Sequence, residues 1–145
     1  MAVWEAVAAL SSVSSTVIVA LAATYAARQV REVKRTRAIT SLVALHQEYQ
    51  SAELSRLRRR LRAHELGDFT QLSADDREGL DNLLQKLELL AVLTNRGLID
   101  EGDVVALFPG IPTTFALLRP YIDLHRSARP GYATHTEELV RRHFR

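Results

Sequence analysis

Apolar and polar residues follow helical spacing along most of the chain, and the first apolar segment is the longest. It runs from Ala6 to Ala27, 22 residues without a charged side chain, which a helix would extend over about 33 Å. The pattern predicts an N-terminal transmembrane helix within residues 1–27.

Two other interpretations of this apolar run stay open. One is a cleaved signal peptide, although here the basic residues follow the apolar run. The other is a buried helix of a soluble protein, because Ser and Thr gather between residues 11 and 16.

A second helical pattern follows in residues 39–66. Apolar residues recur at spacings of three and four from Ile39 to Tyr49 and, after a slip of one position, from Leu54 to Leu61. They predict one long amphipathic helix that ends at Gly67. No Pro or Gly interrupts residues 6–66. The N-terminal helix therefore either continues into this one or breaks between residues 28 and 39, where the apolar stripe lapses.

The third pattern predicts the central helix of the fold. Ser73 is a typical N-cap with acidic residues in the turn after it, and Gly97 is a typical helix stop. Between them, one face carries an apolar stripe made of Leu80, Leu83, Leu84, Leu87, Leu90, Ala91 and Thr94. Leu89, Val92 and Leu93 cover the opposite side, so this helix is expected to be apolar nearly all round and the most buried.

Three shorter helices are predicted after it. Residues 100–108 suit one or two helical turns, Pro112 opens a helix that Pro120 should kink, and a last helix begins at Thr134 or His135 and ends near Phe144. No alternating strand pattern occurs. The predicted fold class is all-α, with one N-terminal transmembrane helix continuing into a cytosolic bundle of four to five helices. Residues 28–66 would form a basic collar and the long amphipathic helix, and residues 67–145 a bundle packing on 39–66.

Composition adds a segregation of charge to this picture. The chain is 47% hydrophobic and 25% charged and contains no Cys, which excludes disordered and disulfide-rich classes. The net charge of +2 is an average: residues 28–62 hold ten basic and three acidic residues, and residues 63–104 hold three basic and ten acidic ones. Opposite charges on the two segments predict that the amphipathic helix and the bundle touch.

The basic residues directly after the apolar run predict its orientation. Excess Lys and Arg mark the cytoplasmic side of a span, so the N-terminus would lie outside and the rest in the cytoplasm, at the inner membrane. We expect these side chains to lie at the anionic lipid surface. This membrane-surface collar consists of Arg28, Arg31, Lys34, Arg35 and Arg37.

A second basic run is a candidate binding face. Three interpretations stay open, in decreasing order of preference: a solvated or internally paired face, a face for anionic lipid or an acidic partner, and a nucleic-acid face. No aromatic residue interleaves the arginines to stack on bases, so nucleic acid is the least favoured partner. The run consists of Arg56, Arg58, Arg59, Arg60 and Arg62.

Glu88 is the carboxylate with the strongest structural implication, because it interrupts an apolar segment where an unpaired charge is costly. We expect a structural ion pair with Arg126, with Arg119 as the other candidate cation. His46, on the apolar stripe, should be a core histidine with one hydrogen-bond partner. The histidines lack metal-ligand spacing, and nucleotide-binding and hydrolase motifs are absent from the sequence. We expect no enzyme activity, no cofactor and no metal.

The small residues of the apolar run support one further hypothesis. Residues four apart, such as Ser11 and Ser15, let two membrane helices approach closely. They make a homo-oligomer through this face a candidate, alongside the alternative that the hydroxyls bond only to their own helix.

The chain also resembles an uncharacterised family of bacterial membrane proteins, known only as a domain of unknown function. The resemblance rests on QVREVKRTRA after the apolar run, LELLAVLTNRGLIDE, LLRPYIDLHR and GYATHTEELV. It implies a single-pass, N-terminally anchored helical module and brings no known activity or site residues. The function expected from the sequence is a membrane-anchored interaction or scaffolding module with an unknown protein partner. A membrane-linked sensor or effector of stress response or phage defence is the alternative, and nucleic-acid binding is the second alternative.

Overall fold

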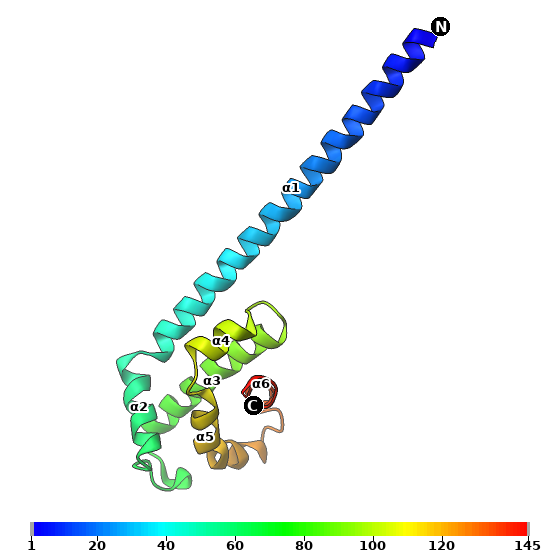
Figure 1. Cartoon of the computed structure of the whole chain (residues 1–145). Coiled ribbons are helices and arrows are strands. Elements are labelled where there is room, and N and C mark those ends of the chain that lie inside the picture. The colour runs from blue at the N-terminus through cyan, green and yellow to red at the C-terminus, as the bar shows by residue number, and fades with distance from the viewer. Residues whose placement is uncertain (1, 145) are drawn as a thin grey trace. The chain divides into compact units, whose positions relative to one another are not determined.

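The computed structural model describes residues 2–144, with side chains at Val19 and from residue 21 onward. This part of the chain contains helices and no strand (Figure 1), so the all-α prediction is confirmed. In chain order the elements are α1 (Ala2–Tyr49), α2 (Ala52–Arg62), the 3-10 helix η1 (Phe69–Gln71), α3 (Ala74–Asn95), α4 (Glu101–Leu107), α5 (Ile111–Arg126) and α6 (Thr134–His143).

The chain divides into two compact units, Met1–Ala38 and Ile39–Arg145. The first unit is a stretch of α1 whose described side chains, at Val19 and at residues 21–37, are all exposed. The second unit holds the end of α1 and the other helices. Residues 39–66 therefore belong to the same unit as residues 67–145.

Helix α1 answers one open question and corrects one prediction. Its backbone is helical without a break through residues 28–39. It ends at Tyr49, however, and the single helix predicted to reach Gly67 is wrong. Ser51 interrupts it, because its hydroxyl accepts a hydrogen bond from the amide of Leu54 and caps α2. The slip in the apolar stripe marks this break in the sequence, since a new helix lets Leu54, Leu57 and Leu61 be buried as well as Leu42 and Tyr49. Ile39 and Val43 of the stripe remain exposed.

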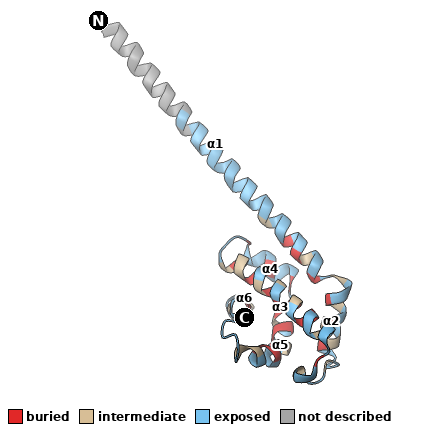
Figure 2. Ribbon diagram, turned by 180° about the vertical axis from the view of Figure 1, so that it is seen from behind, coloured by how far each residue is buried: buried red, intermediate tan, exposed pale blue. Residues whose placement is uncertain are grey.

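Helix α3 confirms the central prediction. The hydroxyl of Ser73 accepts from the amide of Asp76 at its start, and Gly97 follows its end at a φ of +66°, a conformation that favours glycine. Figure 2 shows the buried positions of the second unit. All seven residues of the predicted stripe are among them. Leu89 on the opposite side remains 46% exposed, so the expected burial all round the helix is wrong.

A glycine sets the packing between α2 and α3. A Cβ placed on Gly79 would lie 3.1 Å from a methyl carbon of Leu57, closer than ordinary van der Waals contact. Glycine is thus what allows the two helices to approach at this point. The approach is also supported by charge, because Arg60 of α2 pairs with Asp76 of α3.

The last three helices follow their predicted boundaries. Helix α4 covers the predicted short segment, α5 has Pro112 in its first turn, and α6 begins at Thr134. Helix α5 runs from Ile111 to Arg126 with Pro120 inside it, and the kink expected at Pro120 stays a prediction. Its fully buried residues Leu118, Tyr121 and Ile122 contribute to the core of the second unit.

Within the part of the chain that the structure describes, no helix is both long and apolar enough to cross a bilayer. Most of the predicted span, with Ser11 and Ser15, lies outside the described side chains. The span and the self-association face remain predictions.

Candidate functional site

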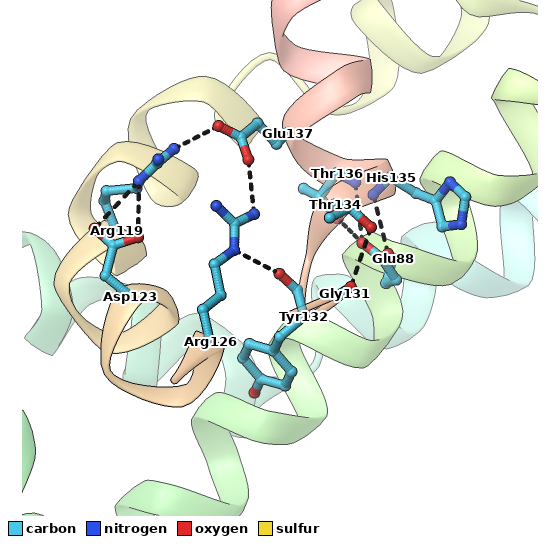
Figure 3. Close-up of polar contacts among 10 residues, drawn as sticks. All are labelled: Glu88, Arg119, Asp123, Arg126, Gly131, Tyr132, Thr134, His135, Thr136 and Glu137. Carbon is cyan, nitrogen blue, oxygen red and sulfur yellow. Dashed lines mark hydrogen bonds and ion pairs between the residues drawn. The ribbon is translucent and has the colours of Figure 1, made fainter. Parts of the chain in front are cut away.

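Polar side chains gather where the loop between α5 and α6 meets α3, and Figure 3 shows most of them. Glu88 comes from α3, Arg119 and Arg126 come from α5, and Glu137 comes from the first turn of α6. Three helices therefore contribute charged groups to one region of the second unit.

Glu88 caps the start of α6 from another helix. Its carboxylate accepts hydrogen bonds from the amides of His135 and Thr136 at 3.0 Å each, and from the Thr136 hydroxyl at 2.7 Å. The residue before α6 is Ala133, which has a φ of +59° and no side-chain acceptor. Amides in the first turn of a helix need such an acceptor, and a carboxylate there also complements the helix dipole. Glu88 supplies both from 47 residues away.

The predicted ion pair between Glu88 and Arg126 is therefore wrong. Arg126 donates instead to Glu137 at 2.6 Å and, through Nε, to the Tyr132 carbonyl at 3.0 Å. The other candidate cation, Arg119, also donates to Glu137, at 2.7 Å. The physical reason is that the amides of α6 already satisfy Glu88, whereas Glu137 lies within reach of both arginines.

The two arginines change the acidity of Glu137. The hydrogen bond from Arg119, followed by the one from Arg126, holds the pKa of the Glu137 carboxyl below its usual value of 4.5. The same contact raises the pKa of Arg119. Because the charged form of Glu137 is favoured in the folded state, this residue stabilises the fold above pH 4.5, and the contribution is lost as the pH falls through the folded-state pKa.

Glu137→Gln should lower the free energy of unfolding by about 1 kcal/mol at pH 7. The figure is that of an exposed pair, since the Glu137 side chain is 38% exposed and solvent screens it. The difference from wild type should shrink as the pH falls below 4.5, because the unfolded-state carboxyl then binds a proton before the folded-state carboxyl does. It should be lost below the folded-state pKa. Urea unfolding between pH 3 and pH 7 measures it, with Glu138→Gln as control because Glu138 pairs with Arg142 of its own helix. A difference independent of pH would contradict the assignment.

Asp81 is a second anchor on α3, two turns before Glu88. Its Oδ1 atom accepts the hydroxyls of Tyr121 at 2.8 Å and Tyr132 at 2.7 Å. Burial and these hydrogen bonds raise the pKa of both tyrosines, so both remain proton donors to the carboxylate. The His125 ring packs against both tyrosine rings, with its centroid 4.3 Å from that of Tyr121 and 5.4 Å from that of Tyr132.

The arginines of the candidate basic face of α2 differ in whether they contact other parts of the chain. Arg58 lies over the Tyr49 ring, 3.7 Å from its centroid, and donates to the Tyr49 carbonyl. Arg60 pairs with Asp76, whose pKa it lowers. Arg56, Arg59 and Arg62 are exposed. Arg62 also donates to the Arg58 carbonyl. Three of the five arginines are thus engaged within the chain, which removes part of the surface that a nucleic acid would need.

The remaining predicted residues belong to α1, apart from the polar cluster of α3, α5 and α6. The five collar residues, Arg28 to Arg37, are exposed on α1. His46 packs edge-on against Phe108, and its buried Nδ1 has no hydrogen-bond partner in the described structure, so the expected bond is absent at that atom. No group of three potential metal ligands occurs among the described residues.

Sequence reasoning missed Asp81, Tyr121, Tyr132 and Glu137. Asp81 gives no signal of its own, because an acidic residue in the first half of a helix is ordinary. The need of α6 for an acceptor from elsewhere was not readable either, because Thr134 and Glu137 form a typical capping pattern and only the structure places Ala133 before the helix.

The family model described as Domain of unknown function (DUF4760) matches residues 11–143. Because this is most of the chain, the protein belongs to that family, and the predicted membership of an uncharacterised family is confirmed. No curated protein and no solved structure matches the chain.

Proposed function

We propose that this member of the DUF4760 family is a membrane-anchored helical module of the interaction or scaffolding kind, without catalytic activity. The observation that carries the proposal is the exposure of large apolar side chains on α1. Val19, Leu21 and Tyr25 are 67%, 65% and 65% exposed. All three belong to the uncharged run from Ala6 to Ala27. Apolar side chains gathered in this way are stabilised when a bilayer covers them.

The charges after the run supply the orientation in this proposal. The exposed collar from Arg28 to Arg37 carries five basic residues and one acidic residue, Glu32. By the positive-inside rule it would lie at the cytoplasmic surface of the inner membrane, with the N-terminus outside and the second unit in the cytoplasm. Leu89, Leu98 and Leu124 are exposed on that unit, at 46%, 56% and 44%, and offer apolar contact area to a protein partner.

Anchoring is tested by Val17→Arg, which places a cation near the middle of the uncharged run. The wild-type chain should stay in the membrane pellet after washes with high salt and alkaline carbonate. Val17→Arg should move most of the protein to the supernatant, because arginine is among the costliest residues at the centre of a span. Val43→Arg is the control, since Val43 is exposed and lies outside the run. Release of the wild-type chain by either wash would contradict the proposal.

The interaction role needs a separate readout. The tagged wild-type chain is captured in mild detergent, and mass spectrometry compares its co-purifying proteins with those of a variant in which Leu89, Leu98 and Leu124 are changed to Gln. A partner enriched with the wild-type chain and lost with this variant supports the role. If no protein is enriched over the variant, the interaction role is wrong even when the anchoring result holds.

A further inference from the structure

A pocket of about 590 Å³ opens along α3, and Leu84 is the one residue of the predicted apolar stripe that lines it. One wall is α3, and the other is the loop between α5 and α6, including Arg129 and Tyr132. The volume is in the range of small-molecule sites. The contacts that hold the loop on α3, through Asp81 and Glu88, therefore also shape this pocket.

Part of the lining of the pocket is apolar. Leu84, Leu89 and Val92 line it from α3, and Ala133 lines it from the loop. Leu89 is 46% exposed although it belongs to a helix whose other leucines are mostly buried. A ligand with an apolar body would cover this surface and gain the free energy of removing it from water.

Two carboxylates border the apolar surface. Asp81 and Glu88 are seven residues apart on α3, about 10 Å along the helix, and both line the pocket. In the described structure neither takes part in an ion pair, and Asp81 Oδ2 has no hydrogen-bond partner, since the two tyrosines donate to Oδ1. Arg129 is the one cation among the lining residues. The lining thus holds two carboxylates against one cation, and this negative balance favours a cationic group beside Asp81.

We propose that this pocket binds a small organic amine, with its apolar body against Leu89 and Val92 and its ammonium group beside Asp81. Tyr132 also lines the pocket and holds Asp81 in place through its hydroxyl. This inference is independent of the proposed membrane anchoring, because all the residues that line the pocket belong to the unit Ile39–Arg145.

The test uses the purified full chain and dansylcadaverine, a fluorescent dansyl group joined by a pentyl chain to one primary ammonium group. The titration is run with the chain in nanodiscs of zwitterionic lipid, with empty nanodiscs subtracted, and in buffer if the chain does not insert. The wild-type chain should show saturable binding. The dansylamide of pentylamine, which lacks the ammonium group, should bind at least about fivefold more weakly.

Two variants locate the site. Asp81→Asn keeps an acceptor for the tyrosines and removes the charge, so it should weaken binding about fivefold or more. Leu89→Lys places a cation of the protein itself at the pocket, and binding should fall at least about tenfold. Leu89 is exposed, so circular dichroism should show an unchanged fold. Asp103→Asn, on α4 and outside the pocket, is the control.

Three results would overturn the inference. The first is a titration of the wild-type chain that does not saturate. The second is that the wild-type chain binds dansylcadaverine and the neutral dansylamide with equal affinity. The third is that Asp81→Asn and Leu89→Lys bind dansylcadaverine as tightly as the control variant does. Neither membrane fractionation nor the capture of protein partners enters any of them, so failure of this inference and failure of the proposed function are distinguishable.

Discussion

Replacing Glu88 by leucine should lower the free energy of unfolding by about 3 kcal/mol. The substitution removes one carboxylate that accepts two amides and one hydroxyl at the start of α6. Thr136 is fully buried, so its amide and hydroxyl would stay without an acceptor and away from water. Hydrogen bonds to a charged group contribute about 1.5 to 3 kcal/mol each, and loss of a helix cap costs about 1 kcal/mol, although such values do not add fully.

Urea unfolding followed by circular dichroism measures the effect, and a second variant separates its causes. Glu88→Gln keeps one acceptor oxygen and loses the charge, so its cost should be clearly smaller than that of Glu88→Leu. Gln85→Leu is the matched control, because Gln85 is exposed, lies one turn earlier on α3 and has no side-chain hydrogen bond in the described structure. Its effect should stay within about 0.5 kcal/mol. If Glu88→Leu were as stable as the control, Glu88 would not be the cap of α6.

Replacing Asp81 by leucine should lower the free energy of unfolding by about 2 to 3 kcal/mol. Two hydroxyls would lose their acceptor, and Tyr121 is fully buried, so its hydroxyl cannot bond to water instead. An unsatisfied buried polar group costs about 1 to 3 kcal/mol. The lost hydrogen bond of Tyr132 should cost less than that of Tyr121, because the Tyr132 side chain is only partly buried and its hydroxyl can bond to water.

Removal of the hydroxyls tests this account of Asp81. In the double variant Tyr121→Phe and Tyr132→Phe, the further change of Asp81 to leucine should cost much less than it does in the wild-type chain, because no buried donor remains to be left unpaired. Thermal and urea unfolding of the four proteins give the coupling energy. A coupling energy near zero would show that Asp81 stabilises the fold by some other contact.

Apolar periodicity predicted the elements that depend on burial alone. Every residue of the stripe from Leu80 to Thr94 is buried, because a helix with one apolar face has one way to remove that face from water. The ends of α3 followed from residues with strong local preferences, Ser73 and Gly97. The division of the predicted amphipathic helix after Tyr49 was visible only as a slip of one position in the apolar pattern. The pattern did not indicate its cause, the helix cap formed by Ser51.

The partners of polar residues were less predictable. The sequence indicated that the charge of Glu88 must be satisfied, and the expected partner was a basic side chain. The actual partners are mainly backbone amides of α6, which every non-proline residue carries and which no residue type marks. Arg126 was correctly expected to form an ion pair, but the acidic side chain that reaches it depends on how α5 and α6 pack, which no local pattern fixes.

The cap that α3 provides for α6 also bears on the order in which the chain folds. An isolated helix of ten residues is marginal in water, and α6 lacks a side-chain cap of its own. Its acceptor lies 47 residues earlier, in the first of the two helices to be synthesised. We therefore expect helix α6 to gain much of its stability from α3, so that α3 serves as a template for the last helix.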